Sequence, residues 1–319
     1  MRRDLFPILL WLLLALSAQA AAPLNALDAF VVSKGYGGAQ FVRYQNTYRL
    51  PINANGKVGD LTIDTGAGST IIYKAGLKKF GLVGTETNEH VHGVFGKGAE
   101  KVGIVTIHQL AMGNLTLMNV KAGAISDANS GGFYREYGLS DGLLGLREML
   151  KYGMVLDLSN SLILAHPGGP MKGISDGIRS ILTKQGYTAV SLSIVEGHLQ
   201  TPAVVNGTPC KLIVDTGAFL TVIDRAFARK ARIGGHDTGI VAHGLGTKGR
   251  GVGYSQFDEL RVGDFPIKNA SVTISDLDPD ITGGKMQSAG LLGAEYLGLH
   301  GAVFDFNSAT LYLRPKKSP

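Results

Sequence analysis

The 319-residue sequence predicts an all-β protein built from two homologous lobes. Most of its 45 glycines fall singly between short β-rich runs such as Val102–Ile107 and Ser271–Ile274, a pattern typical of short strands joined by tight turns. A set of motifs in the first half of the chain recurs in the second half in the same order. Two copies are too few for a solenoid, so we expect two lobes with a few short helices.

The N-terminus has the features of a secretory signal peptide. Arg2 and Arg3 precede an apolar run that reaches Leu16, and small residues follow up to Ala20. The run is too short to span a bilayer comfortably, although an uncleaved anchor is the alternative. We therefore expect residues 1–20 to be removed and the mature chain to be exported, periplasmic or secreted, without stable membrane insertion.

Composition excludes several classes of site and partner. Cys210 is the only cysteine, so neither an intramolecular disulfide nor a thiolate metal cluster can form. The net charge of +6 comes from scattered basic residues, and aromatic residues do not alternate with them. We expect no nucleic-acid partner.

The repeat divides the chain into segments. Short helices are predicted at Gly173–Gln185, Arg147–Tyr152 and Glu295–Leu299, and a strand near Phe41–Tyr44. The predicted segments are a lead-in at 21–45, lobe one at 46–168, a linker at 169–187, lobe two at 188–314 and a basic tail at 315–319.

Each lobe carries an apolar run that ends in Asp-Thr-Gly-Ala, at Asp64 and at Asp215, 151 residues apart (215 − 64). A carboxylate at the end of a buried strand is costly unless hydrogen bonds or a paired charge hold it. One copy fits a structural turn as well as catalysis, whereas two copies suggest a joint role. If the loops meet, the two carboxylates share one proton. The ionised member can then activate water while the protonated member donates to a carbonyl oxygen.

Further motifs follow both aspartates at parallel spacing. The pairs His92-Gly93 and His243-Gly244 each begin 28 residues after the aspartate of their lobe (92 − 64 and 243 − 215). Gly-Leu-Leu-Gly occurs at 142–145 and again at 290–293. This order of motifs makes chance recurrence a poor explanation.

With these motifs, residues from about 48 to 313 resemble the aspartic peptidases of the pepsin and retropepsin type. The resemblance rests on Asp-Thr-Gly-Ala at Asp64 and Asp215 and on Leu-Leu-Gly at 143–145 and 291–293. It implies two β-barrel lobes with an active-site cleft between them and Asp64 and Asp215 as the catalytic pair. It further implies an endopeptidase acting on a peptide or protein substrate without a cofactor, as a monomer because one chain holds both acids.

The resemblance assigns supporting roles to the loop residues. The threonines would lock the two loops together and the glycines would let backbone approach the carboxylates; these are Thr65, Thr216, Gly66 and Gly217. Ala67 and Ala218 follow the retropepsin form, where pepsins usually carry serine. Without that hydroxyl the ionised carboxylate has one hydrogen bond fewer, which predicts a less acidic pH optimum.

Two flaps are expected over the cleft. The stretch 91–96 lacks the tyrosine of pepsin flaps, and lobe two repeats a flap-like stretch at 242–246. Metal binding by the two histidines is disfavoured because metal sites usually need three or four ligands. We therefore predict no metal, and treat as flap or substrate contacts His92, Gly93, Phe95, His243 and Gly244.

Two other classes of protein remain to be compared with the peptidase. A non-catalytic exported peptide-binding protein would keep the cleft without needing acids, so Asp64 and Asp215 argue against it. An obligate dimer with active sites between chains is the second alternative, and the fusion of two unlike lobes argues against that.

Overall fold

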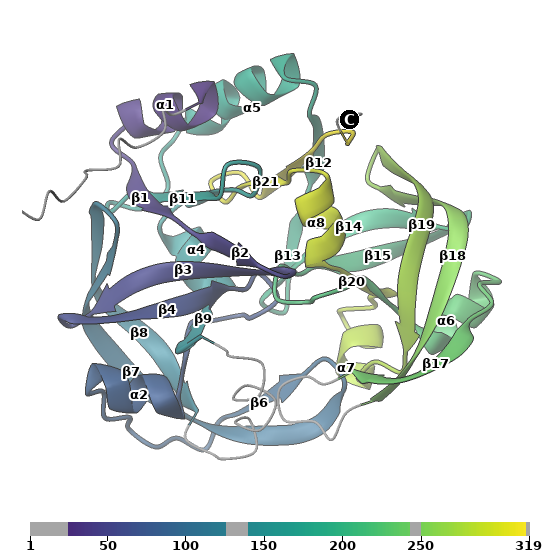
Figure 1. Cartoon of the computed structure of the whole chain (residues 1–319), viewed down its shortest axis with the longest axis horizontal. Coiled ribbons are helices and arrows are strands. Elements are labelled where there is room, and N and C mark those ends of the chain that lie inside the picture. The colour runs from purple at the N-terminus through teal and green to yellow at the C-terminus, as the bar shows by residue number, and fades with distance from the viewer. Residues whose placement is uncertain (1–24, 126–139, 243–249, 317–319) are drawn as a thin grey trace, which may run out of the picture.

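The computed structural model describes residues 25–125, 140–242 and 250–316, and strands predominate in these ranges (Figure 1). Two eight-stranded sheets form the two lobes, and a six-stranded sheet joins them. The prediction of an all-β chain with two homologous lobes is confirmed.

The sheet of lobe one places chain neighbours and distant strands side by side. Its hydrogen-bonded order is β2 (Val42–Tyr44), β3 (Thr47–Ala54), β4 (Lys57–Ile63), β9 (Gly142–Leu144), β5 (Ile71–Tyr73), β8 (Leu115–Ile125), β7 (Gly96–Met112) and β6 (His90–Gly93). The short β9 inserts between β4 and β5, parallel to β4 and antiparallel to β5.

Lobe two repeats this order strand for strand. The sequence of strands is β13 (Ser193–Val195), β14 (His198–Val205), β15 (Thr208–Val214), β20 (Gly290–Leu292), β16 (Val222–Asp224), β19 (Phe265–Ser275), β18 (Arg250–Val262) and β17 (His236–Ala242). The short β20 again lies parallel to the strand before the aspartate and antiparallel to the strand after it.

The six-stranded sheet takes three strands from each half of the chain. Its order is β1 (Gly37–Gln40), β11 (Leu162–Ala165), β10 (Val155–Asp157), β21 (Val303–Asp305), β22 (Thr310–Leu313) and β12 (Thr188–Ser191). The halves meet where β10 pairs with β21, with Leu156 opposite Phe304. Both side chains are fully buried, so the junction of the lobes belongs to the hydrophobic core.

Local sequence explains the hairpins that lead to the aspartates. In β3 every second residue faces the core, from Tyr48 to Ala54, as expected for a half-buried strand. Asn55 and Gly56 both have positive φ, the geometry of the two-residue turn that Asn-Gly favours. Asn206 and Gly207 repeat this turn between β14 and β15.

Three predicted helices are present, as α4 (Leu146–Lys151), α5 (Ile174–Lys184) and α8 (Ala294–Leu299). The described residues form four further helices that the sequence analysis does not predict: α1 (Ala26–Ser33), α2 (Lys74–Phe80), α6 (Arg225–Lys230) and α7 (Pro279–Thr282). The last three span seven residues or fewer, too short for periodicity to reveal them. No helix in the described ranges is long and apolar enough to cross a membrane.

The lead-in is more ordered than its sequence indicates, because α1 and β1 precede the expected strand β2. The side chain of Asn25 accepts hydrogen bonds from the N–H groups of Leu27 and Asp28, and so begins α1. Leu27 and Val31 are buried with Ile178 of α5 against the six-stranded sheet. In Figure 1 both helices lie at the end of the molecule opposite the β6–β7 hairpin.

Asp28 makes the stability of this region depend on pH. Its side chain is 2% exposed, and burial, with the nearby charge of Asp157, raises its pKa to about 7. A raised carboxyl pKa means that the folded chain binds a proton that the unfolded chain releases. Stability therefore falls as pH rises from about 4 to above 7, by at most about 4 kcal/mol for this group.

A neutral amide in place of the Asp28 carboxyl is expected to remove this pH dependence. We predict that Asp28→Asn leaves the free energy of unfolding nearly unchanged at about pH 4 and raises it by about 2 kcal/mol at about pH 8. Urea unfolding at both pH values measures the effect. Equal stability of parent and variant at the higher pH would contradict the assignment.

Candidate active site

The Leu-Leu-Gly strand of each lobe binds the start of the Asp-Thr-Gly loop of the same lobe. The backbone N–H of Asp64 donates to the carbonyl oxygen of Leu144 at 3.0 Å, and that of Asp215 donates to Leu292 at 3.0 Å. Since β9 and β20 pair with strands on both sides, each loop starts from a fixed position in the centre of its sheet.

Backbone donors orient both carboxylates. Asp64 Oδ1 accepts from the N–H groups two and three residues further along, both at 2.9 Å. Asp215 Oδ1 accepts the equivalent pair at 2.8 and 3.1 Å. With one oxygen held in this way, the carboxyl plane of each aspartate is set by its own loop.

The glycine of each loop lies against the aspartate of the other loop. A Cβ atom on Gly66 would be 2.3 Å from Asp215 Cγ, and one on Gly217 would be 2.4 Å from Asp64 Cγ. Any side chain at these positions would overlap the opposite carboxyl. The two carboxyls therefore meet at the interface of the lobes because glycine allows this approach.

Threonine side chains tie the loops to each other. Thr65 Oγ1 accepts from the N–H of Thr216 at 3.0 Å and donates to the carbonyl oxygen of Val214 at 2.8 Å. Thr216 Oγ1 makes the same two bonds in the other direction, with Thr65 N at 3.0 Å and the carbonyl of Ile63 at 2.8 Å. Both threonines are fully buried, so four satisfied hydrogen bonds fix the two loops together.

Burial and mutual repulsion raise the pKa of the pair. Asp215 is 6% exposed and Asp64 is partly buried. Burial raises the pKa of both carboxyls, and the charge of Asp215 raises that of Asp64 further. The first proton is therefore lost above the ordinary carboxyl range and the second is held more tightly still, so the two groups share a proton as a pair.

His198 is a neighbour of the pair that sequence reasoning missed. It begins β14; burial raises the pKa of Asp215, the hydrogen bonds from Gly217, Asp64 and Ala218 lower it, and a positive charge on His198 would lower it further. The equivalent position in lobe one is Thr47, 151 residues earlier, and threonine carries no charge. A single histidine outside any motif offers no sequence signal for this role.

The flap of lobe one reaches across to lobe two. The β6–β7 hairpin turns at Val94 and Phe95, and Figure 1 shows it extending below the lobes towards α7. Val94 O accepts from the N–H of Asp278, and Phe95 O accepts from Arg250 Nε, both at 2.9 Å. The Phe95 side chain is 6% exposed and packs among apolar side chains of lobe two, including Ile213.

The other predicted flap residues are described only in part. Gly93 ends β6, and His92 lies in the same strand, although its side chain is outside the described atoms. His243 and Gly244 lie outside the described residues, between β17 and β18. Among the residues that the structure does describe, no three His, Cys, Asp or Glu side chains are grouped to hold a metal ion.

Two glutamates behind the loops also escaped sequence reasoning. Glu148 Oε2 accepts from the N–H and the hydroxyl of Thr70, and Glu295 Oε1 accepts from the N–H of Thr221. Each threonine hydroxyl in turn accepts from the glycine that ends Leu-Leu-Gly. The glutamates thus brace the far side of each loop. They follow that glycine by three residues in lobe one and by two in lobe two, which hides the equivalence.

The fold and this site define a bilobal β protein with paired acidic loops at the lobe interface. A protein-family model described as aspartyl protease matches residues 50–147 and 201–296. The chain belongs to the aspartyl protease family, and each lobe carries one copy of the family's fold. A search of curated proteins found no match.

Proposed function

We propose that this protein is an aspartic endopeptidase that hydrolyses peptide bonds with the Asp64–Asp215 pair and a water molecule. The observation that carries the proposal is the close approach of the two carboxyls, each against the glycine of the opposite loop. Two acids with raised pKa at one point, each held by backbone donors, provide a base and an acid together.

The proposed reaction uses the shared proton. The ionised carboxylate removes a proton from water as the water oxygen attacks the peptide carbonyl carbon. The protonated carboxyl gives its proton to the carbonyl oxygen and stabilises the tetrahedral intermediate. The carboxyl that took the proton of the water passes it to the amide nitrogen, and the other carboxylate takes a hydroxyl proton from the tetrahedral intermediate. The C–N bond then breaks and releases an acid and an amine, and the pair again holds one shared proton.

The substrate would be a peptide in extended conformation. The flap strands β6 and β17 lie at the edges of their sheets, where a peptide can add backbone hydrogen bonds. One chain supplies both aspartates, so we propose a monomer. Residues 1–20 have the pattern of a signal peptide, and we propose that the enzyme is exported to the periplasm or the medium.

Cleavage of a peptide library between about pH 3 and about pH 8 tests the proposal. We expect a bell-shaped pH–rate profile that peaks above pH 3.8, the ordinary value for the aspartate carboxyl, because burial raises both pKa values. Asp64→Asn and Asp215→Asn should each lower kcat by roughly 10²–10⁴-fold.

Binding of peptides without cleavage at any pH would support the alternative, an exported peptide-binding protein that keeps the fold. Cleavage that survives in both asparagine variants would exclude the pair as the catalytic groups. A profile that peaks below about pH 3 would contradict the raised pKa values.

A further inference from the structure

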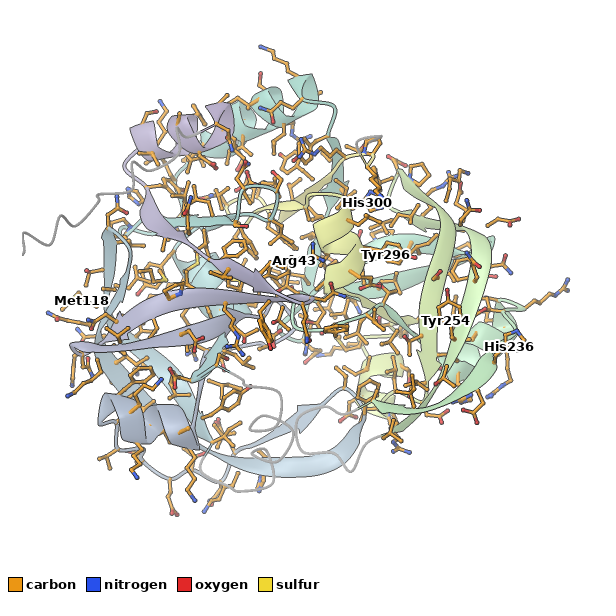
Figure 2. All side chains as sticks on the ribbon, in the orientation of Figure 1. Arg43, Met118, His236, Tyr254, Tyr296 and His300 are labelled. Carbon is orange, nitrogen blue, oxygen red and sulfur yellow. The ribbon has the colours of Figure 1, made fainter. Side chains whose placement is uncertain are left out.

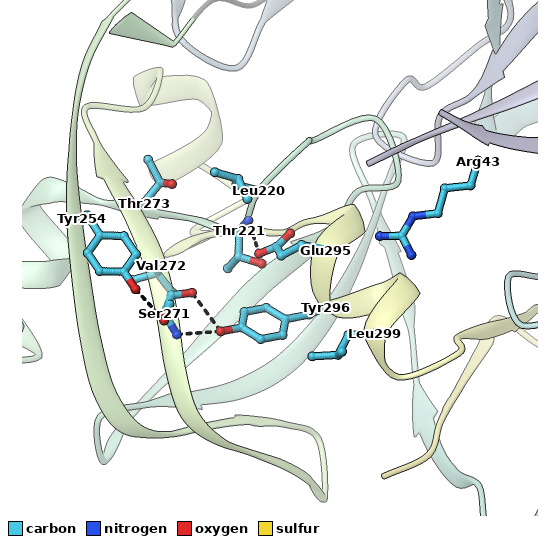
Figure 3. A pocket seen from close by; sticks show the side chains of 10 residues that line it. All are labelled: Arg43, Leu220, Thr221, Tyr254, Ser271, Val272, Thr273, Glu295, Tyr296 and Leu299. Carbon is cyan, nitrogen blue, oxygen red and sulfur yellow. Dashed lines mark hydrogen bonds between the residues drawn. The ribbon is translucent and has the colours of Figure 1, made fainter. Parts of the chain in front are cut away.

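A hollow of about 310 Å³ lies on lobe two beside α8, where the helix faces β18 and β19 (Figure 3). Neither aspartate of the pair lines it. Its lining includes two exposed apolar side chains, Leu220 and Leu299, and the exposed Tyr254. Figure 2 places Arg43 near the junction of the lobes and Tyr296 and Tyr254 further into lobe two.

The equivalent place in lobe one is filled by the chain itself. Arg147 Nε donates to Glu148 Oε1 at 2.8 Å, and its Nη2 donates to the carbonyl oxygen of Lys121. The guanidinium therefore links Glu148, which supports the Asp64 loop, to strand β8. Glu148, which is 2% exposed, thus has a cation as partner.

The described part of lobe two retains the carboxylate and shows no cation bound to it. Glu295 braces Thr221 as Glu148 braces Thr70, but none of the salt bridges among the described residues includes Glu295. Its Oε2 is buried and has no hydrogen-bond partner in the described part of the chain. Burial raises the pKa of Glu295, against hydrogen bonds from Thr221 and from the backbone of Glu295 and Tyr296 that lower it.

The neighbouring side chain in lobe two cannot replace the guanidinium. Ser271 of β19 corresponds to Lys121 of β8. Lys121 lies two residues before Gly123, which pairs with Ile71, and Ser271 lies two residues before Thr273, which pairs with Val222. Tyr296 OH donates to the carbonyl oxygen of Ser271 and accepts from its N–H. The phenol thus takes the strand contact of Arg147, and no cation among the described residues binds the free oxygen of Glu295.

We propose that this hollow is a second binding site, one that takes the guanidinium of an arginine side chain presented by a peptide, with Glu295 as its acceptor. The ligand group would occupy the place that Arg147 occupies in lobe one. Its methylene stem would lie on Leu220 and Leu299, and the guanidinium plane can stack on the Tyr254 ring. This site goes beyond the proposed catalysis and does not depend on it.

Arg43 restricts the ligand at the opposite end of the hollow. Its guanidinium is held by the carbonyl of Gln45 and the side chain of Asn46 and lies against Gly298 near the end of α8, and Figure 3 shows it apart from Glu295. A polyamine would bring a second positive charge towards Arg43. An arginine residue brings peptide carbonyl groups there instead, which a guanidinium can bind.

Binding of Nα-acetyl-arginine amide to the full mature chain tests the site, with the citrulline analogue as a neutral isostere. We expect ¹H–¹⁵N NMR shifts at the Thr221 and Ser271 amides and, by calorimetry at neutral pH, an affinity roughly 10- to 100-fold higher for the arginine compound. Equal affinity for the two compounds, or shifts confined to other regions, would overturn the proposal.

Matched variants locate the acceptor. Glu295→Gln keeps a carbonyl oxygen for Thr221 and should weaken arginine binding roughly 10- to 100-fold, whereas Glu148→Gln should leave it unchanged because Arg147 already occupies that carboxylate. Leu299→Arg, four residues after Glu295 on α8, should fill the hollow and abolish binding without altering the acceptor. Undiminished binding to the Leu299 variant, or equal weakening in the two glutamine variants, would show that the site is elsewhere.

Discussion

Alanine at Gly217 is expected to lower the rate of peptide cleavage by roughly 100-fold or more, because a misplacement of about 1 Å in a catalytic group has an effect of this size. The added Cβ would lie 2.4 Å from Asp64 Cγ and 2.5 Å from both carboxyl oxygens. Asp64 cannot swing away freely, since two backbone N–H groups hold its Oδ1. The carboxyl and the opposite loop must separate, so the shared proton is lost along with the geometry.

Gly66→Ala should have the same effect on Asp215, and Gly68→Ala provides the matched control. The nearest atom to a Cβ on Gly68 is the carbonyl oxygen of Gly197, at 3.4 Å, an ordinary contact. All three variants are compared by kcat on one peptide and by thermal unfolding. If Gly217→Ala retained the activity of Gly68→Ala, the proposed closeness of the carboxyls in solution would be wrong.

The repeat in the sequence predicted the arrangement of the lobes well. Asp64 and Asp215 are 151 residues apart, and Leu-Leu-Gly follows each of them. This repeat predicted that the two lobes build their acidic loops from equivalent strands. The two sheets indeed have the same strand order. Such motifs are informative because turns and glycines at close approaches leave few alternative residues.

Contacts between distant segments could not be predicted in the same way. Helix α1 of the lead-in packs against α5 and the six-stranded sheet. Helix α5 and most strands of that sheet lie more than a hundred residues further along the chain, so the local sequence does not reveal these contacts. Phe95 was expected over the cleft as a flap residue, and the structure packs it into lobe two. Its apolar character is compatible with either place, so sequence alone does not distinguish them.

The glutamates that support the two loops are equivalent in the structure, but a shift of one residue hides this in the sequence. Glu148 and Glu295 perform the same task from positions that differ by one residue along their helices. An alignment by offset pairs Arg147 with Glu295 and Glu148 with Tyr296, which obscures both the shared carboxylate and the missing cation. Only the hydrogen bonds reveal which side chains are equivalent.

Valine at Thr216 is expected to lower the free energy of unfolding by about 2–6 kcal/mol, since it leaves two buried backbone groups unpaired at about 1–3 kcal/mol each. Those groups are the N–H of Thr65 and the carbonyl of Ile63, which Thr216 Oγ1 now satisfies. Valine has nearly the shape of threonine but no hydroxyl, so the loss of stability reports mainly the lost hydrogen bonds. The loss is a large fraction of the about 5–15 kcal/mol typical of a folded domain.

Urea unfolding of the valine variants measures this effect, and Thr201→Val is the control. Thr201 is equally buried, but its hydroxyl makes only long contacts of 3.3 Å to Ser191 O and Pro202 O, so we expect a loss below about 1 kcal/mol. Thr65→Val should match Thr216→Val, and the double variant should lose less than the sum, because both hydroxyls belong to one network. If Thr216→Val were no more destabilised than Thr201→Val, the network would not hold the lobes together. Strict additivity would mean that the two loops are supported independently, and the shared position of the carboxyls would then need another cause.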